Sequence, residues 1–183
     1  MRMPSATAVA SPRNRENETS ASLDAQQFKS ALAEFPAAVT AVTCWNDLGE
    51  PTGATLSAVC SLSLDPPLML ACFDRSSSTL KALSQEGKRL LIHLLAQGQE
   101  AAAVKLSGKG NDKFSELNWA PTEFGPRLEG ACRTFECEVD ALLTAGDHVI
   151  VAALVHKIEE TVHQPLLYHR RELYAVPAKN ALR

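Results

Sequence analysis

The segment PTGATLSAVCSLSLDPPLMLACFD, residues 51–74, carries the strongest structural signal in this chain. It begins with a turn, is interrupted at Pro66-Pro67, and ends in apolar residues that are typical of a strand. Between these points small hydroxyl residues alternate with leucine and alanine, so in an extended chain they would share one face, broken only by Val59. The hydroxyl residues of this face are Thr55, Ser57, Ser61 and Ser63. One face is then free to bind a polar ligand while the other packs.

The pattern alone leaves two interpretations of this hydroxyl face open. Serine and threonine supply neutral donors and acceptors, which suit a planar heterocycle rich in carbonyl groups and ring nitrogens. The same residues are equally typical of the solvent face of an ordinary antiparallel strand. The choice between ligand and solvent therefore depends on what surrounds this segment.

The composition predicts one well-cored domain with a tail. The chain has 183 residues, 45% of them hydrophobic, and a formal net charge of -3. This balance argues against a nucleic-acid or membrane-surface partner, because both require clustered positive charge, and no apolar run reaches membrane-spanning length. We expect a disordered N-terminal tail without an export signal at residues 1–22, one domain at residues 23–178, a C-terminal tail at residues 179–183, and a cytoplasmic location.

The cysteines and short motifs narrow the chemistry. Five cysteines without CxxC spacing favour buried free thiols over a zinc or redox site; they are Cys44, Cys60, Cys72, Cys132 and Cys137. No GxGxxG segment follows a strand, and no P-loop is present. We therefore expect no metal site, and an enzyme that uses a nicotinamide nucleotide here would bind it without a Rossmann unit.

The remaining pattern predicts short strands with few helices. A helix begins at Asp24, where Gln27 completes a capping box, and Pro36 ends it. Strands are expected at residues 37–45, 67–74, 88–95, 131–143 and 149–158, helices after Ser76 or Ser77 and at residues 97–106, and a loop at residues 118–130. In the fourth strand the residues expected to face the core are Phe135, Cys137, Val139 and Ala141. Repeated short strands indicate an antiparallel barrel or sandwich.

Several motifs resemble one known family. They are Gly53-Ala54-Thr55, the SLSLDPPL segment at residues 61–68, the serine-rich turn that follows, Gly146-Asp147-His148, and the closing hairpin PLLYHRRELY at residues 165–174. In identity and order they resemble the FMN-binding split-barrel family, specifically its short-chain flavin reductases. The resemblance covers about residues 28–176. It implies a mainly β, six-stranded antiparallel Greek-key split barrel with peripheral helices.

The resemblance also implies an activity and partners. It implies an NAD(P)H:flavin oxidoreductase that transfers a hydride from NADH or NADPH to FMN, with FAD as a possible substrate. The reduced flavin would pass to a partner monooxygenase, and the protein would be a homodimer. Two alternatives stay open: a flavin-binding protein without reductase turnover, and a split-barrel flavoenzyme that reduces another acceptor such as a corrinoid.

Site residues follow from the same resemblance. It implies that Thr55, Ser57 and Ser61 hold the flavin, that Arg75 and Ser77 hold its phosphate, and that His148 orients the nicotinamide. The full cofactor-binding set is Gly53, Ala54, Thr55, Leu56, Ser57, Ser61, Arg75, Ser76, Ser77, Thr79 and His93, and the catalytic residue is His148.

Structural roles compete with these assignments. A run of serines is commonly a helix N-cap, although free amides, the helix dipole and Arg75 also suit a phosphate. A lone histidine in an apolar strand, such as His93, is typically a core residue, and His148 can simply follow a turn capped by Asp147. Three lysines in and after the helix expected at residues 97–106 can approach a phosphate or form solvated surface; they are Lys105, Lys109 and Lys113.

The chain departs from the family pattern at several positions. Ser57-Ala58-Val59 replaces Asn-Ser-Phe, His93 replaces asparagine, and Ala37-Ala38-Val39-Thr40 lacks a glycine. Arg171 stands where the family has glycine, at a hairpin turn whose backbone geometry normally uses that residue. These changes bear on flavin affinity and flavin choice.

Overall fold

The computed structural model describes residues 23–110 and 112–176. The tails expected at residues 1–22 and 179–183 lie outside the described residues. Helix α1 (Ala25–Leu32) belongs to an N-terminal unit of its own. Its start is as predicted, because the Gln27 amide donates to the Asp24 carboxylate at 3.0 Å. The helix ends at Leu32, one turn earlier than the pattern suggested.

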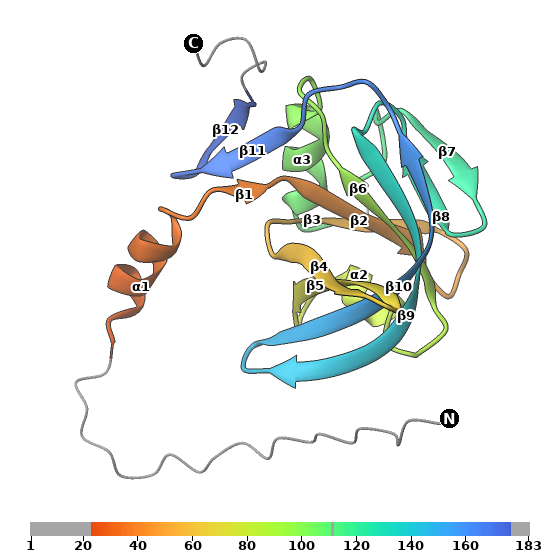
Figure 1. Ribbon diagram of the computed structural model, residues 1–183, viewed down its shortest axis with the longest axis horizontal. Helices are drawn as coiled ribbons and strands as arrows, with labels where there is room; N and C mark the ends of the chain where they lie inside the picture. The colour runs from red at the N-terminus through yellow and green to blue at the C-terminus, as the bar shows by residue number, and fades with distance from the viewer. Residues whose placement is uncertain (1–22, 111, 177–183) are drawn as a thin grey trace. The chain divides into compact units, whose positions relative to one another are not determined.

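The rest of the described chain is built on one curled antiparallel sheet (Figure 1). Its seven strands lie in the order β3-β2-β6-β9-β10-β5-β4. They are β2 (Thr40–Trp45), β3 (Pro51–Leu56), β4 (Val59–Leu64), β5 (Pro67–Asp74), β6 (Arg89–Leu94), β9 (Arg133–Ala145) and β10 (His148–Glu160). The mainly β class is confirmed, with seven strands in the main sheet where six were expected.

Two small sheets complete the fold. One joins β1 (Ala37–Ala38) to the closing hairpin β11 (Leu166–His169) and β12 (Glu172–Ala175), and the other is the hairpin β7 (Trp119–Thr122) and β8 (Gly125–Leu128). The prediction of a loop at residues 118–130 is therefore wrong, because most of this segment forms the β7–β8 hairpin. Gly125, at φ 144°, makes the hairpin possible, because a Cβ there would lie 2.9 Å from Cα of Cys44 on β2.

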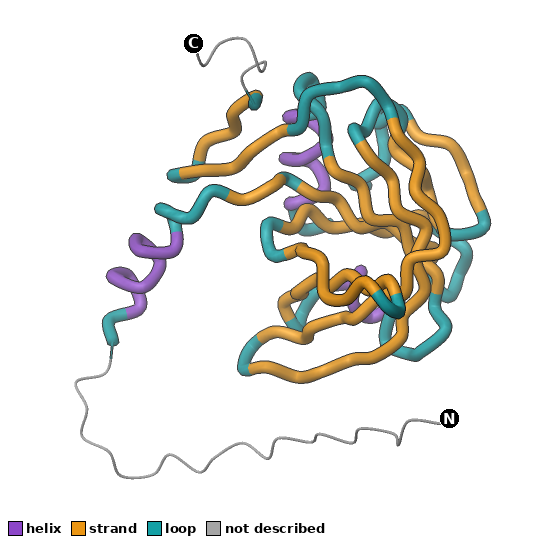
Figure 2. Tube along the Cα trace, in the orientation of Figure 1, coloured by secondary structure: helices purple, strands orange, loops and turns teal. Residues whose placement is uncertain are grey.

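Two short helices lie against the same end of the sheet. Helix α2 (Ser78–Ala82) and helix α3 (Glu100–Ser107) both contact β3 and β2 (Figure 2). They match the predicted peripheral helices, although α2 has only five residues. Strand β3 thus runs between two helices, and the site described below is built along it.

The core has two parts. The larger cluster fills the barrel around Val42, Phe73, Leu90 and Ile92, and the smaller one packs α3 and β11 through Leu106 and Leu166. All six of these side chains are at most 1% exposed. The barrel wall that carries the site is therefore rigidly supported from behind.

The strand predicted at residues 131–143 faces the core only in part. Cys137 and Val139 are buried as expected, but Ala141 is exposed. The register of β9 against β10 shifts between Ala152 and Ala153, where Asp140 is the extra residue. Such a bulge exchanges the two faces of a strand, so the alternation breaks at that point.

The cysteine prediction holds for three of five residues. Cys44, Cys132 and Cys137 are buried, and burial raises the pKa of the Cys44 and Cys137 thiols to about 12. Cys60 is exposed and Cys72 is partly exposed, because both lie near the β4 edge of the sheet.

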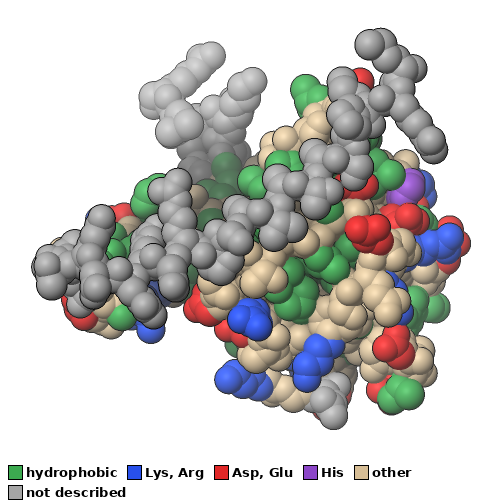
Figure 3. Space-filling model, turned by 90° about the horizontal axis from the view of Figure 1, so that it is seen from below, with side chains coloured by type: hydrophobic (Ala, Val, Ile, Leu, Met, Phe, Trp, Pro, Cys, Tyr) green, Lys and Arg blue, Asp and Glu red, His purple; other side chains and the backbone are tan. Residues whose placement is uncertain are grey.

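The surface carries charges of both signs. On the part drawn in colour in Figure 3, lysine and arginine side chains are interspersed with acidic and hydrophobic ones. Among the described residues no helix is long and apolar enough to cross a membrane.

Candidate functional site

The hydroxyl segment does not form one strand. Strand β3 ends at Leu56 and β4 begins at Val59, and these two strands lie at opposite edges of the seven-stranded order. The single hydroxyl face predicted from alternation is therefore wrong. Ser57 lies at the junction, whereas Ser61 lies on the exposed β4 strand and lines neither of the two cavities described next.

A first cavity, about 570 Å³ in volume, opens between β3 and the serine-rich turn. We call it the lysine cavity. Its walls are Ala54, Thr55, Leu56, Phe73, Asp74, Ser76, Ser77, Ser78, Leu106, Ser107, Gly108, Lys109, Gly110 and Lys113. The structure thus brings together the serines predicted to hold a phosphate and two of the lysines whose role the sequence left open.

Lys113 is held at the base of this cavity by backbone carbonyls. Its Nζ donates to the Gly53 oxygen at 3.0 Å and to the Leu106 oxygen at 3.3 Å. Three donors on an ammonium group leave one for a ligand. Partial burial lowers the pKa of Lys113, and a bound anion would offset that desolvation. Residues of this type and placement fit a phosphate group.

The serine turn is both a cap and a cavity wall. Ser77 Oγ accepts from the Leu80 amide at 3.4 Å, which confirms its N-cap role. The Ser76 amide and hydroxyl donate to the Asp74 carboxylate at 2.7 and 2.6 Å, and these bonds, ahead of the nearby charges of His148 and Lys109, lower the pKa of Asp74. Since α2 is a single turn, attraction of an anion here rests on Lys109, Lys113 and the hydroxyls rather than on a helix dipole.

Two residues of the predicted cofactor-binding set lie elsewhere. Arg75 lines neither cavity, and its amide donates to the Asp147 oxygen at 3.0 Å. Thr79 is fully buried, with its hydroxyl 3.3 Å from that of Thr52. Thr79 therefore presents no surface to either cavity in this structure. The lysines of the loop after α3 supply the positive charge that the sequence interpretation had given to Arg75.

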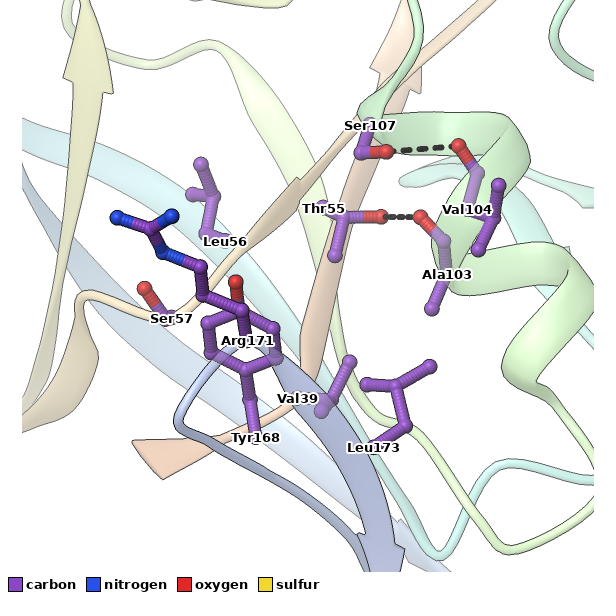
Figure 4. A pocket seen from close by; sticks show the side chains of 10 residues that line it. All are labelled: Val39, Thr55, Leu56, Ser57, Ala103, Val104, Ser107, Tyr168, Arg171 and Leu173. Atoms are coloured by element: carbon purple, nitrogen blue, oxygen red, sulfur yellow. Dashed lines mark hydrogen bonds between the residues drawn. The ribbon is translucent and has the colours of Figure 1, made fainter. Parts of the chain in front are cut away.

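A second cavity, about 370 Å³ in volume, continues along β3 and α3 (Figure 4). We call it the tyrosine cavity. Its walls are Val39, Thr55, Leu56, Ser57, Ala103, Val104, Ser107, Tyr168, Arg171 and Leu173. Thr55, Leu56 and Ser107 line both cavities, which are therefore contiguous. The apolar side chains and the Tyr168 ring suit a planar ring system.

The hydroxyls shared by the cavities are already bonded to helix α3. Thr55 Oγ1 donates to the Ala103 oxygen at 2.6 Å, and Ser107 Oγ donates to the Val104 oxygen at 2.7 Å (Figure 4). Thr55 therefore joins β3 to α3 and shapes the cavity, and its donor is not free for a flavin. Ser57 is exposed at the rim of the tyrosine cavity.

The turn of the closing hairpin has an unusual backbone. Arg170 and Arg171 adopt φ angles of 51° and 67°, the left-handed conformation that two-residue hairpin turns require. This is the geometry for which the family pattern has glycine. A residue with a Cβ pays roughly 1–2 kcal/mol for that conformation. Arg170 forms an ion pair with Glu34 at 2.8 Å, whereas Arg171 lines the tyrosine cavity.

His148 lies at the edge of the site. It is partly exposed, its Nδ1 is 2.8 Å from Asp147 Oδ1, and it pairs with Asp74 across β10 and β5. The hydrogen bond with His148, followed by its charge, lowers the pKa of Asp147. His148 lines neither cavity, but the Asp147 oxygen accepts the Arg75 amide, so the Gly-Asp-His turn contacts the serine turn directly.

His93 is a core residue. It has no exposed surface, and its Nε2 and Nδ1 lie 3.1 and 3.2 Å from the hydroxyls of Thr43 and Thr134. Desolvation lowers the pKa of His93 to about 3, so the ring is neutral. His93 therefore has the core role in this structure and lines neither cavity.

Gly53 supports the site from behind. A Cβ at this position would lie 3.1 Å from the Phe114 ring and 3.1 Å from the Val42 oxygen. The absent side chain lets β3 pack closely against Phe114, while the Gly53 carbonyl holds Lys113. Ala54, Leu56, Ser76 and Ser77, which belong to the predicted cofactor-binding set, lie on cavity walls.

Comparisons with known proteins find one family. A family model described as "Flavin reductase like domain" matches residues 32–177. A flavin reductase (NADH) of Kitasatospora aureofaciens is 36% identical, over 86% of this chain and 84% of that protein. The reductase subunit HsaB of a flavin-dependent monooxygenase from Mycobacterium tuberculosis is 32% identical, over 82% of each chain.

A solved structure shares the fold. The NADH:FAD oxidoreductase SgcE6 of Streptomyces globisporus C-1027, in complex with NAD and FAD fragments, superposes with a TM-score of 0.79. It is 27% identical, and the match covers 85% of this chain and 94% of that one.

Proposed function

The chain belongs to the flavin reductase family, and from this premise we propose that its lysine and tyrosine cavities together form the substrate site. It is an NAD(P)H-dependent flavin reductase. In this reaction the nicotinamide ring loses a hydride, the flavin ring gains that hydride together with one proton, and NAD(P)⁺ and dihydroflavin are the products. The flavin supplies the electron-accepting ring system.

The proposed position of the flavin rests on one observation: the lysine cavity and the tyrosine cavity share Thr55 and Leu56. A mononucleotide flavin carries a charged phosphate at one end and a planar ring at the other. Lys109, Lys113 and the Ser77 hydroxyl would hold the phosphate, which for FMN is terminal and for FAD is the first of two. Leu56 and the rim at Ser57 would border the ring.

The catalytic contribution of the protein is placement. Hydride transfer requires two rings stacked at near-attack distance, and it needs no protein nucleophile. The Asp147 carboxylate orients the His148 ring through Nδ1 and leaves Nε2 directed away from that bond. We assign His148 the orientation of the nicotinamide beside the serine turn.

The partner follows from the relatives. Because HsaB is the reductase subunit of a flavin-dependent monooxygenase, we propose that dihydroflavin made here leaves the site and supplies a monooxygenase. FMN is the proposed flavin and NADH the proposed donor, in a homodimeric protein in the cytoplasm.

The test is NADH oxidation under air. Purified protein is mixed with NADH, FMN is then added, and absorbance at the nicotinamide band is followed. We expect rapid loss of NADH that depends on added FMN. Flavin binding without NADH or NADPH oxidation would contradict this function and favour a flavin carrier, while saturation by a corrinoid and not by flavin would favour the other acceptor.

A further inference from the structure

We infer that Arg171 selects the dinucleotide substrate by binding a phosphate that lies beyond the flavin mononucleotide unit. The inference rests on the proposed function and names a specificity residue within that site. It concerns a position where this chain has arginine and the family pattern has glycine.

The first argument is where the guanidinium lies. Arg171 lines the tyrosine cavity together with Leu56, Ser57 and Tyr168. In Figure 4 its side chain extends past Tyr168 toward Leu56 and Ser57. Within residues 23–110 and 112–176 it has no carboxylate in ion-pair range and no hydrogen-bond acceptor. It therefore presents a charged fork of donors to the cavity.

The neighbouring arginine provides an internal comparison. Arg170 occupies the same turn and the same left-handed backbone region. Its Nε and one terminal nitrogen donate to Glu34 Oε2 at 2.9 and 2.8 Å. One arginine of the turn is thus used to attach the hairpin to residue 34, and the other faces the cavity.

Both arginines have this backbone, so the contrast between them lies in their side-chain partners. At φ 67°, glycine would be favoured over any residue with a Cβ. Strained conformations of this kind occur in two-residue hairpin turns and also at functional sites. Because Arg171 makes no ion pair or side-chain hydrogen bond among the described residues, we attribute its presence here to a ligand contact.

The chemistry of the cavity specifies the ligand. A guanidinium binds phosphate oxygens through paired hydrogen bonds. The single phosphate of FMN is assigned to the lysine cavity, so a phosphate at Arg171 belongs to a longer molecule. Both sources are dinucleotides: the adenylate half of FAD, or the phosphates of NADH or NADPH. Tyr168 and the apolar walls next to Arg171 offer a surface for a ring of the same molecule.

The experiment compares R171G with R170G. Both variants replace a strained arginine by glycine in the same turn, so both should fold, and thermal unfolding verifies this. Riboflavin, FMN, FAD, NADH and NADPH are titrated separately by calorimetry with each variant and with the unaltered protein.

For R171G we expect affinity for one dinucleotide class to fall about 10- to 100-fold, the range of a charge-assisted contact. Riboflavin and FMN should stay within about twofold, and R170G should resemble the unaltered protein. A loss confined to FAD identifies the flavin dinucleotide, an equal loss for NADH and NADPH identifies the pyrophosphate, and a loss for NADPH alone identifies the 2′-phosphate.

Other results overturn the inference. If R171G lost as much affinity for riboflavin as for the dinucleotide, Arg171 would be a ring contact. If it lost as much affinity for FMN but not for riboflavin, Arg171 would contact the first phosphate. No change for any ligand, or the same change in R170G, would also reject it. These titrations do not depend on turnover, so absence of NADH oxidation by the unaltered protein would count against the proposed function alone.

Discussion

The barrel interior and the two cavities along β3 use the same polar residue types in opposite ways. Inside the barrel, Thr43, His93 and Thr134 bond to one another and leave no donor for a ligand. Among the described residues no buried side-chain nitrogen or oxygen lacks a partner. In the cavities, by contrast, Lys113 keeps a donor, and Arg171 has no ion-pair or hydrogen-bond partner within residues 23–110 and 112–176. A polar group whose hydrogen bonds are all made inside the protein is structural, and one that keeps a free donor can bind a ligand, whatever the residue type.

The largest expected effect comes from removing the cavity charge. Lys113→Met should weaken FMN binding about 10- to 100-fold, because a charged hydrogen bond contributes about 1.5–3 kcal/mol. Riboflavin, which lacks the phosphate, should bind with nearly unchanged affinity. Fluorescence titration with both flavins provides the measurement. Lys157→Met is the matched control, since Lys157 pairs with Glu136 and Glu159 away from both cavities.

The interior should respond in stability rather than in binding. Thr43→Val removes the donor to the Pro126 oxygen and the partner of His93 Nε2. Leaving buried polar groups unpaired should lower the free energy of unfolding by about 1–3 kcal/mol. Urea denaturation measures this change, with exposed Thr144→Val as the control. A Thr43→Val protein of normal stability and reduced FMN affinity would break the distinction drawn between the two regions.

The pKa of His93 gives the interior a pH dependence. Its folded pKa of about 3 lies below the ordinary 6.5, so between these values only the unfolded chain binds this proton. The contribution of neutral His93 is complete above about pH 6.5 and is lost as pH falls toward 3. For this single group, the free energy of unfolding changes by at most about 1.4 kcal/mol per pH unit. Urea unfolding at pH 7.5, 6.0 and 5.0 gives the free energy of unfolding at each pH. This free energy should change less with pH in His93→Gln than in the unaltered protein, and an identical pH dependence in the two proteins would contradict this account.

The smallest effect is expected at the boundary between the cavities. Thr55→Val removes the bond to the Ala103 oxygen that joins β3 to α3. A neutral, partly exposed hydrogen bond contributes about 1 kcal/mol, so stability should fall by that amount while FMN affinity changes less than about threefold. Thr55→Ser keeps the hydroxyl and should restore stability. A large loss of FMN affinity in Thr55→Val alone would return Thr55 to the direct flavin contacts.

The fold was predictable where local signals and motif identity agree. The turn at residues 46–49 closes β2 and β3, with the Asn46 carboxamide oxygen accepting the Leu48 and Glu50 amides. The strand at residues 67–74 has the predicted bounds. Errors arose where long-range packing decides: Gly125 admits a hairpin because Cys44 lies beneath it, and Asp140 shifts the faces of β9 through its pairing with β10.

The candidate site was predictable only in part, for the same reason. Alternation could not reveal that β3 and β4 separate after Leu56, since both are extended segments. Thr79 and Ser77 are two residues apart in sequence, yet one is buried and the other lines the lysine cavity. Lys109 and Lys113 were visible as charges in a glycine-containing loop, but nothing local placed them opposite the serine turn.

A crystal structure with FMN tests the central claim most directly. The account predicts that the phosphate lies in the lysine cavity, within hydrogen-bonding distance of Lys113 and Ser77, with the ring against Leu56 and Ser57 and with His93 untouched in the barrel. A phosphate bound outside the lysine cavity, or a ring on the exposed face of β4 near Ser61, would contradict it.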